Sequence, residues 1–424
     1  MIRPDGLIPL RIRALLYMLT KEQEYAKERL LNFIVSSKSE IILTGTPGTG
    51  KTFFLAEFLK SCSEDIKSLR EIGLNVKINS LICTATTNKA SNLLRKAKTI
   101  YTLLGLKPVI DKTTGMTYLE KWQNVDRKDT LYIIDEASMI SSDLYKYIQE
   151  EIKKGNKFMY VGDINQLPPV NDNNFSVFNL PNLEVLEFTK ILRTNSTDLQ
   201  GLIIDIRDNM KCPNAVISLL NNLKDSEHIH ILKGEEDVKQ VLENFTNCDK
   251  CIAYTNKRVN KINGYMRALR KMPKNISSGD LVVSKSSVCN TDNGFRLCCE
   301  DVLTVKYIKQ DSRNPGAYLI SFLNVPGEFH GFNDVYKYDT ECKRIYTECK
   351  KKKNFTAYAN FSDMYLKLKF SYASTVHSAQ GSTYNKVFVD LTDINSCNDI
   401  ETFIRLIYVA ISRAKDEVYI YYGD

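Results

Sequence analysis

Several features that would assign this chain to a special class are missing from its sequence. No run of 18 or more apolar residues occurs, so a transmembrane helix is not expected. Neither a repeat of fixed period nor a long low-complexity tract is present, so nothing indicates a repeat architecture. The 11 cysteines are odd in number and follow no framework spacing. This cysteine usage fits a reducing cytosol and not a secreted disulfide scaffold, so we expect a cytoplasmic protein.

A strong charge of either sign is also missing. The chain has 58 lysines and arginines against 50 acidic residues, a net charge of +8 over 424 residues. This balance suits a polyanionic partner but does not identify one. The first 20 residues are basic and apolar, yet Arg11 and Arg13 interrupt the apolar stretch and no small-residue cleavage site follows. We therefore expect a leading helix there, and a removed targeting peptide is the less favoured alternative.

The length and the order of the hydrophobic segments predict more than one domain. A chain of 424 residues exceeds what one compact core usually holds, so two to four domains are expected. Apolar, β-branched runs alternate with helical patterns in the first half, which is typical of a parallel sheet covered on both faces. The predicted strands are 41–43, 81–83, 131–134 and 157–161, and the predicted helices include 51–62 and 141–154.

The same alternation restarts in the second half and is interrupted once. The strands predicted for a second parallel sheet are 251–256, 369–375, 386–391 and 417–422. Over residues 276–368, short strands are separated by turn signals such as Asn293-Gly294 and Pro326-Gly327. We therefore predict an α/β protein with two parallel-sheet domains and a small β-barrel inserted into the second.

A phosphate-binding pattern, GxxxxGK[ST], lies between a predicted strand and a predicted helix. Glycines let backbone N–H groups turn inward around phosphate oxygens, and the helix directs its positive end at the same anion. Lys51 is expected to reach the β- and γ-phosphates of a nucleotide, and the Thr52 hydroxyl to bind Mg²⁺. A glycine-rich turn without a ligand is the alternative. The predicted nucleotide-binding residues of this loop are Gly45, Thr46, Pro47, Gly48, Thr49, Gly50, Lys51 and Thr52.

Charged residues elsewhere complete the predicted nucleotide site. Asp135 and Glu136 end an apolar strand, where Asp135 can hold Mg²⁺ and Glu136 can orient or deprotonate the attacking water. Arg193 and Arg413, near the start and the end of the second domain, are expected to stabilise the charge on the γ-phosphate oxygens. Taken alone, the acidic pair is typical of a helix N-terminus and each arginine of a surface salt bridge. The prediction therefore rests on the whole set.

A set of motifs follows the order of a known family. The chain resembles superfamily 1 helicases of the 5′-to-3′ branch, and is most similar to the group of the phage Dda helicase and its RecD-like relatives. The resemblance runs from about residue 18 to the C-terminus. Its motifs are LTKEQ (19–23), TATTNKASNLL (84–94), TIYTLLGL (99–106), VGDINQLPPV (161–170), FTKILRT (188–194), AYTNKRVNKIN (253–263), ASTVHSAQGST (373–383) and RLIYVAISRAK (405–415).

This resemblance implies roles for individual residues. Gln23 would read the adenine edge, Gln166 would sense the γ-phosphate, and Gln380 and Gly381 would lie toward the nucleotide. The implied catalytic residues are Lys51, Glu136, Gln166, Arg193 and Arg413. The residues implied to contact nucleic acid are Thr87, Asn88, Thr99, Tyr101, Thr255, Asn256, Thr375 and His377. The sequence QLPPV (166–170) is similar to the 5′-to-3′ group, which implies that polarity.

The resemblance also implies a layout of two RecA-like domains with the P-loop NTPase fold. The first would span residues 1–187, with a short pin-type insertion at about 91–125. The second would span 188–275 and 369–424, separated by the inserted barrel at 276–368. The strand-separating residues of the pin are not identified by the sequence.

The implied function is that of an ATP-dependent 5′-to-3′ DNA helicase and single-stranded DNA translocase. It would use ATP and Mg²⁺ in a cleft between the two domains, in replication, recombination or repair. Its partners would be single-stranded and forked duplex DNA, not a membrane. We expect a monomer in the cytoplasm of a bacterial or phage-infected cell, with a single-strand-binding or replication protein as an optional partner. The alternatives are an RNA helicase of the same superfamily and a non-motor, ATP-gated single-strand-binding protein.

Two further signals are weaker. Lys350–Lys353 form a run of four lysines, which favours a solvated loop of the inserted barrel over a nucleic-acid contact. Cys248 and Cys251 have zinc-like spacing, and His228 and His230 lie upstream of them. Because no second pair of cysteines at this spacing occurs, zinc is not expected.

Overall fold

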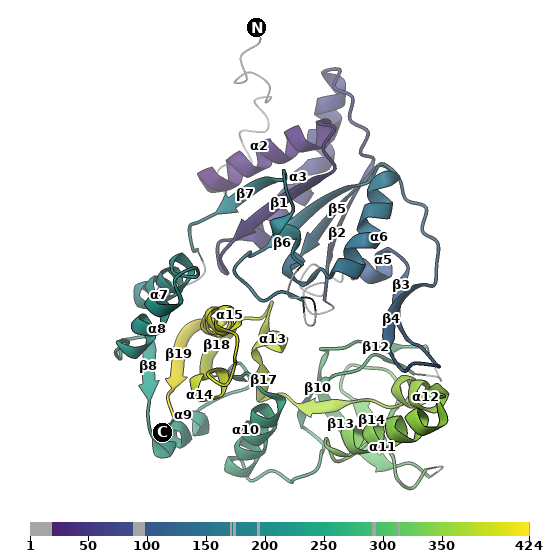
Figure 1. The fold of residues 1–424 in the computed structure, drawn as a ribbon, viewed down its shortest axis with the longest axis vertical. Coiled ribbons are helices and arrows are strands. Elements are labelled where there is room, and N and C mark those ends of the chain that lie inside the picture. The colour runs from purple at the N-terminus through teal and green to yellow at the C-terminus, as the bar shows by residue number, and fades with distance from the viewer. Residues whose placement is uncertain are drawn as a thin grey trace. The chain divides into compact units, whose positions relative to one another are not determined.

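Two parallel sheets, one in each of two structural units, organise the chain (Figure 1). The computed structural model describes residues 19–87, 98–169, 172, 175–192, 196–290, 294–312 and 314–423. The first unit consists of residues 1–85, 126–164 and 168–193, and the second of residues 86–125, 165–167 and 194–424. The leading helix predicted within the first 20 residues falls almost entirely outside the described part.

The sheet of the first unit has the strand order β2-β5-β6-β1-β7, and every pairing in it is parallel. Its strands are β1 (Glu40–Gly45), β2 (Ser80–Ala85), β5 (Thr130–Asp135), β6 (Lys157–Gly162) and β7 (Glu184–Phe188). The helices are α2 (Lys21–Val35), α3 (Lys51–Glu71) and α6 (Ser142–Lys153), with short 3₁₀ helices at Ala137–Met139 and Val177–Asn179. The four predicted strands and both predicted helices are confirmed, whereas β7 was not predicted.

Aromatic packing fixes the start of α3 against this sheet. Phe54 and Phe58 are fully buried on one face of the helix, and burying a side chain of this size contributes about 2–3 kcal/mol each. The ring of Phe54 meets that of Phe188 edge-on, with 5.3 Å between centroids. The last residue of β7 therefore holds the first turn of α3, and with it the loop that precedes this helix.

The second unit contains the other parallel sheet, with the order β17-β9-β18-β19-β8. Its strands are β8 (Ile229–Leu232), β9 (Lys250–Ala253), β17 (Ala373–Thr375), β18 (Tyr384–Asp390) and β19 (Ala414–Tyr421). Its helices are α7 (Thr197–Asp208), α8 (Pro213–Asn221), α9 (Glu235–Glu243), α10 (Asn256–Leu269), α13 (Val376–Ala379), α14 (Leu391–Ile394) and α15 (Ile400–Ile411). The strands predicted at 386–391 and 417–422 are confirmed in this sheet, whereas the one predicted at 251–256 ends at Ala253 and is followed by α10 from Asn256.

The strand predicted at 369–375 is wrong as a single element. Residues Leu368–Phe370 form β16, which pairs with the inserted sheet, and only Ala373–Thr375 pair with β9. Ser371 and Tyr372 lie between the two strands. Apolar residues at 368, 370 and 372 alternate with polar ones across the boundary, so hydropathy gives no mark of the change of sheet.

The region inserted between α10 and β17 holds an antiparallel sheet of order β15-β14-β13-β10-β16. Its strands are β10 (Leu281–Ser284), β13 (Val302–Gln310), β14 (Tyr318–Phe322), β15 (Phe329–Gly331) and β16, and a separate pair is formed by β11 (Val288–Cys289) and β12 (Arg296–Leu297). Short antiparallel strands are confirmed here. That they close into a barrel stays a prediction.

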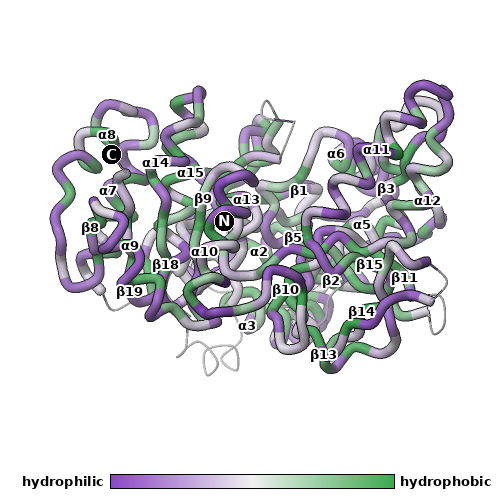
Figure 2. Tube along the Cα trace, turned by 90° about the horizontal axis from the view of Figure 1, so that it is seen from below, coloured by the Kyte–Doolittle hydropathy of each residue, from purple (hydrophilic) through white to green (hydrophobic). Residues whose placement is uncertain are grey.

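Two helices that the turn signals did not predict belong to the same region, α11 (Lys337–Lys352) and α12 (Thr356–Met364). Helix α11 is mostly hydrophilic (Figure 2). The lysine run predicted to lie in a barrel loop instead forms its last turn, and Lys353 ends the helix with a φ of 51°. Cations are favourable there because the C-terminus of a helix carries a partial negative charge.

The sequence did not predict the two strands that form a hairpin between residues 106 and 121. Strands β3 (Leu106–Ile110) and β4 (Thr117–Lys121) pair antiparallel after the short helix α5 (Ile100–Leu103). Its turn contacts the segment before α12, since the Phe355 N–H donates to the carbonyl of Lys112 at 2.7 Å. A Cβ on Gly115 would come within 2.5 Å of the Phe355 ring. The hairpin thus belongs to the second unit by its contacts.

No helix in the part of the chain that the structure describes combines the length and apolar character needed to cross a membrane.

Candidate nucleotide and nucleic-acid sites

The phosphate loop joins β1 to α3 in a conformation that requires glycine. Gly48 and Gly50 have φ values of 90° and 83°, in the left-handed region that other residues rarely adopt. At Gly45 a Cβ would lie 2.6 Å from the carbonyl oxygen of Phe188. The glycines of the pattern therefore permit both the turn and the close approach of the backbone.

Lys51 lies over this loop. Its ammonium donates to the carbonyl of Gly45 at 2.5 Å and to that of Thr46 at 3.0 Å. The Thr49 hydroxyl donates to the carbonyl of Thr46 at 2.9 Å and so closes the turn. The predicted loop residues are thus brought together around one backbone turn, with a cation at its centre.

The acidic pair at the end of β5 lies near this cation. Asp135 ends the strand, and one of its carboxylate oxygens accepts the N–H of Glu136 at 2.9 Å. Burial raises the pKa of Asp135, while the amide of Glu136 and the charge of Lys51 act in the opposite direction. Glu136 itself has a φ of 52°, which is costly for a residue with a Cβ and is typical of functional positions.

Two buried polar atoms beside the loop fit a nucleotide ligand. Gln23 and Thr20 form a capping box at the start of α2, in which the Gln23 side-chain oxygen accepts the Thr20 N–H at 3.0 Å. This leaves the Gln23 Nε2 buried with no hydrogen-bond partner among the described residues, close to Gly50. The Thr46 hydroxyl is likewise buried without a partner among them. Such donors are costly unless a ligand pairs them.

In the second unit, Gln166 and Gln380 are brought together. Residues 165–167 group with this unit although they directly follow the strand β6 and Ile164 along the chain. The side-chain N–H₂ of Gln380 donates to the side-chain oxygen of Gln166 at 2.9 Å. The Arg405 guanidinium donates to the backbone carbonyl of Gln166 at 2.8 Å. Arg405 was not predicted, although it is the first residue of the motif RLIYVAISRAK.

Of the two predicted arginines, Arg413 lies within the described part of the chain. Arg193 lies outside the described residues. Arg413 is only 2% exposed, and its guanidinium donates to the carbonyls of Val409 and Ser382 at 3.0 and 3.2 Å and to the Ser412 hydroxyl at 2.9 Å. The catalytic role of both arginines stays a prediction.

Four of the predicted nucleic-acid contacts lie at the ends of two neighbouring strands. Thr255 and Asn256 follow β9, whereas Thr375 ends β17 and His377 lies in α13, and Thr375 pairs with Ala253 in the sheet. Thr255 and Thr375 cap the helices that begin there. Burial lowers the pKa of His377, which favours its neutral form.

The Thr255 cap is held in place by a carboxylate from α14. Asp393 accepts the N–H groups of Tyr254 and Thr255, both at 2.7 Å, and the Thr255 hydroxyl at 2.8 Å. Asp393 was not predicted as a site residue, because nothing in its local sequence indicates a contact with residues 139 positions away.

The remaining predicted contacts lie nearer the N-terminus. Thr87 follows β2 and is half-buried, and Asn88 lies outside the described residues. Thr99 caps α5 through the N–H of Thr102, and burial raises the pKa of the half-buried Tyr101. Contact of any of these residues with nucleic acid stays a prediction.

The zinc-like spacing does not produce a metal site in the described residues. Cys251 is buried in β9, whereas Cys248 is exposed. Within the described ranges, no group of three or more His, Cys, Asp or Glu side chains could hold a metal ion.

Comparison with known proteins agrees with this arrangement. Residues 18–234 match the AAA domain family, and residues 370–421 match the UvrD-like helicase C-terminal domain. The chain is 23% identical to the ATP-dependent DNA helicase Dda of Enterobacteria phage T4, over 95% of this chain and 98% of that protein. It is 24% identical to an uncharacterized protein of Acanthamoeba polyphaga mimivirus, over 95% of this chain and 99% of that protein.

A solved structure shares the fold. The crystal structure of Bacteroides Pif1 bound to single-stranded DNA superposes with a TM-score of 0.55 at 17% identity, covering 95% of this chain and 92% of that one. This likeness confirms the prediction of two RecA-like domains. Because the AAA domain model covers just over half of the 424 residues and the motifs follow the family order, the chain belongs to the AAA domain family, among the superfamily 1 helicases of the 5′-to-3′ branch that resemble Dda and RecD.

Proposed function

We propose that this protein is an ATP-dependent DNA helicase that moves along single-stranded DNA in the 5′-to-3′ direction. The observation that carries this proposal is the phosphate loop, in which Lys51 sits over a glycine-dependent turn beside the acidic pair of β5. The name of the phage T4 relative, an ATP-dependent DNA helicase that aligns along nearly the whole chain, supports the same activity.

Each residue of the nucleotide site has a proposed task. Lys51 binds the β- and γ-phosphates, and Glu136 orients and deprotonates the attacking water. Gln23 offers its buried amide N–H₂ to the adenine edge. Arg193 and Arg413 provide guanidinium groups for the charge that develops on the γ-phosphate.

The donor set beside the loop fits Mg²⁺. Thr52, at the second residue of α3, supplies a hydroxyl, and Asp135 supplies a carboxylate at the end of the adjacent strand β5. Oxygen donors of this kind are the ones Mg²⁺ prefers. When bound, the ion would neutralise charge on the β- and γ-phosphate oxygens.

For the nucleic acid, we propose sequence-independent contacts with the backbone of one strand. The proposed contacts are Thr87, Asn88, Thr99, Tyr101, Thr255, Asn256, Thr375 and His377. Hydroxyls and amides bound to phosphates position a strand without reading its bases. The domain boundaries at 187, 275 and 368 and the pin-type insertion at about 91–125 belong to this proposal. Within that insertion, the hairpin β3–β4 is the proposed pin.

Unwinding of forked DNA tests the function directly. Forks with only a 5′ single-stranded tail should be unwound in an ATP-dependent manner, whereas forks with only a 3′ tail should not. An RNA homopolymer should stimulate the ATPase less than a DNA homopolymer does. Unwinding only from 3′ tails would contradict the polarity, and stronger stimulation by RNA would favour the RNA helicase. ATP binding without turnover in the presence of DNA would favour the non-motor protein.

A further inference from the structure

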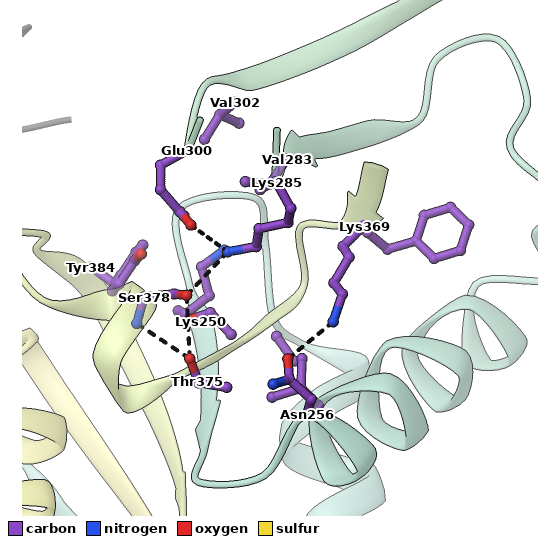
Figure 3. Close-up of a pocket in the computed structure, with 14 residues that line it drawn as sticks. Lys250, Asn256, Val283, Lys285, Glu300, Val302, Lys369, Thr375, Ser378 and Tyr384 are labelled. Atoms are coloured by element: carbon purple, nitrogen blue, oxygen red, sulfur yellow. Dashed lines mark hydrogen bonds and ion pairs between the residues drawn. The ribbon is translucent and has the colours of Figure 1, made fainter. Parts of the chain in front are cut away.

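A small, positively charged cavity lies in the second unit between the parallel sheet and the inserted antiparallel sheet (Figure 3). From the side of the antiparallel sheet come Lys285, the residue after β10, and Lys369 of β16. The parallel side contributes Lys250 from β9, Thr375 from β17 and other polar side chains. Three lysines but only one carboxylate line the cavity, so it carries two net positive charges.

The carboxylate belongs to Glu300 and neutralises Lys285. The Lys285 ammonium lies 2.6 Å from a Glu300 carboxylate oxygen and donates to the Ser378 hydroxyl at 3.0 Å. The side chains of Lys285 and Glu300 are only 20% and 25% exposed. Glu300 has a φ of 71°, a backbone conformation that is unfavourable for a residue with a Cβ. The turn before β13 therefore holds a charged residue over the cavity at an energetic cost.

Lys369, by contrast, has a neutral partner. Its ammonium donates to the side-chain oxygen of Asn256 at 3.0 Å, and Figure 3 shows both side chains pointing toward one another. Burial, followed by the charge of Lys367, lowers the pKa of Lys369, although Asp339 and Glu300 act in the opposite direction. An anion entering the cavity would lower the energetic cost of keeping this ammonium charged.

The cavity is small. Its volume of about 40 Å³ gives room for about one or two water molecules. The oxygens of a phosphate group fit a space of this size. Asn256 and Thr375, at its wall, are residues already proposed to contact the strand.

We propose that this cavity seats one backbone phosphate of the bound single strand, and that Glu300 competes with that phosphate for the ammonium of Lys285. Without a strand, Lys285 pairs with Glu300. When a phosphate enters, Lys285 and Lys369 donate to its oxygens, and Glu300 loses its partner. Glu300 therefore weakens strand binding and eases release in each step. This inference rests on the proposed function, since it names a residue-level contact for the strand.

The test is binding of a fluorescently labelled oligothymidine to the full chain, measured by anisotropy over a series of salt concentrations. Glu300→Gln should bind about threefold to tenfold more tightly than the wild type, because the competing charge is gone. Lys285→Gln should bind roughly tenfold more weakly, and its plot of log affinity against log salt should be shallower by about 0.7, the contribution of one single-strand phosphate contact. A merely structural salt bridge would not change that slope.

A second ion pair of the same sheet provides a matched control. Lys309 and Glu328 are also 2.6 Å apart and do not line the cavity. Lys309→Gln and Glu328→Gln should leave affinity and slope within about twofold of the wild type, since this pair lies outside the cavity and Lys309 is 54% exposed. In a Lys285→Gln background, Glu300→Gln should no longer tighten binding, because the competition requires Lys285.

The possible outcomes separate this inference from the proposed function. If the wild type binds oligothymidine but Glu300→Gln fails to tighten binding, the competition is refuted and the helicase proposal stands. If Lys285→Gln raises the KM for ATP and leaves strand affinity unchanged, the cavity serves the nucleotide, which also refutes the inference. If the wild type does not bind oligothymidine at all, both proposals fail. Should Lys285→Gln not fold, Glu300→Gln alone still decides.

Discussion

At the scale of single residues, the nucleotide site contains an unfavourable backbone conformation and a buried polar atom. Glu136 has a positive φ, and Gln23 has a buried amide nitrogen without a partner among the described residues. Each feature costs stability, and both occur beside the phosphate loop. Features of this kind persist when a ligand or a reaction requires them.

Replacement of the loop lysine tests the catalytic assignment. Lys51→Ala should reduce single-strand-stimulated ATPase activity by at least about a hundredfold, because the ammonium that binds the β- and γ-phosphates is removed. Its affinity for single-stranded DNA should be nearly unchanged. Lys60→Ala is the control, since Lys60 lies on the same helix, is 59% exposed and pairs with Glu57, three residues before it. Undiminished ATP turnover in Lys51→Ala would contradict the site.

A buried lysine predicts how stability depends on pH. The Lys157 ammonium donates to the carbonyls of Phe33 and Ser36 at 2.7 and 2.6 Å, and burial lowers its pKa to about 8. In the unfolded chain this pKa is about 10.4. Between these values the unfolded chain binds more protons, so the contribution of Lys157 to the free energy of unfolding rises with pH.

Urea denaturation measures this effect by comparison with Lys157→Met. From about pH 8 to about pH 10, the free energy of unfolding of the wild type should rise relative to that of the variant. The comparison removes the effects of tyrosines that titrate in the same range. A difference that stays constant or falls with pH would contradict the lowered pKa.

At the scale of elements, the sequence predicted best where a strand is buried on both faces. Strands β1 and β5 are continuous apolar runs bounded by polar residues, so hydropathy alone marks them. Strands β3 and β4 are exposed along much of their length and carry lysines and a proline, so no such signal exists. The turn of the hairpin contacts Phe355, far away in sequence, and local patterns cannot reveal that contact.

The docking of this hairpin predicts different effects at two glycines. Gly115 and Gly279 have φ values of 73° and 86°, so alanine costs about 1–2 kcal/mol of backbone strain at either position. Only at Gly115 does a Cβ clash with the Phe355 ring, whereas nothing lies within 4 Å of the Cβ position at Gly279. Gly115→Ala should therefore separate the hairpin from the segment before α12, and Gly279→Ala should not.

Hydrogen exchange of the Phe355 amide reports this separation, because that N–H donates to the carbonyl of Lys112. Its exchange should be about tenfold faster or more in Gly115→Ala and close to wild type in Gly279→Ala. Unwinding of forked DNA should fall with it if the hairpin is the pin. Equal protection of Phe355 in the two variants would show that the contact does not hold the hairpin.

At the scale of the whole molecule, the motifs predicted the family although overall identity to the phage T4 relative is only 23%. They did not predict which side chains meet. Gln166 and Gln380 were assigned to separate motifs, 214 residues apart, and their hydrogen bond follows only from the fold. Arg405 joins them through the Gln166 carbonyl, although neither charge nor hydropathy distinguishes it in the sequence.

This hydrogen bond predicts that ATP turnover and DNA binding are coupled through the two glutamines. Gln166→Ala and Gln380→Ala should each lose most of the stimulation of ATPase activity by single-stranded DNA, about tenfold or more. The double variant should be no worse than either single one, because residues that act through one contact are not additive. Gln310→Ala is the control, since this exposed glutamine donates to the carbonyl of Pro315, five residues away. Additive losses in the double variant would mean that the glutamines act separately, and the bond between them would then have no part in coupling.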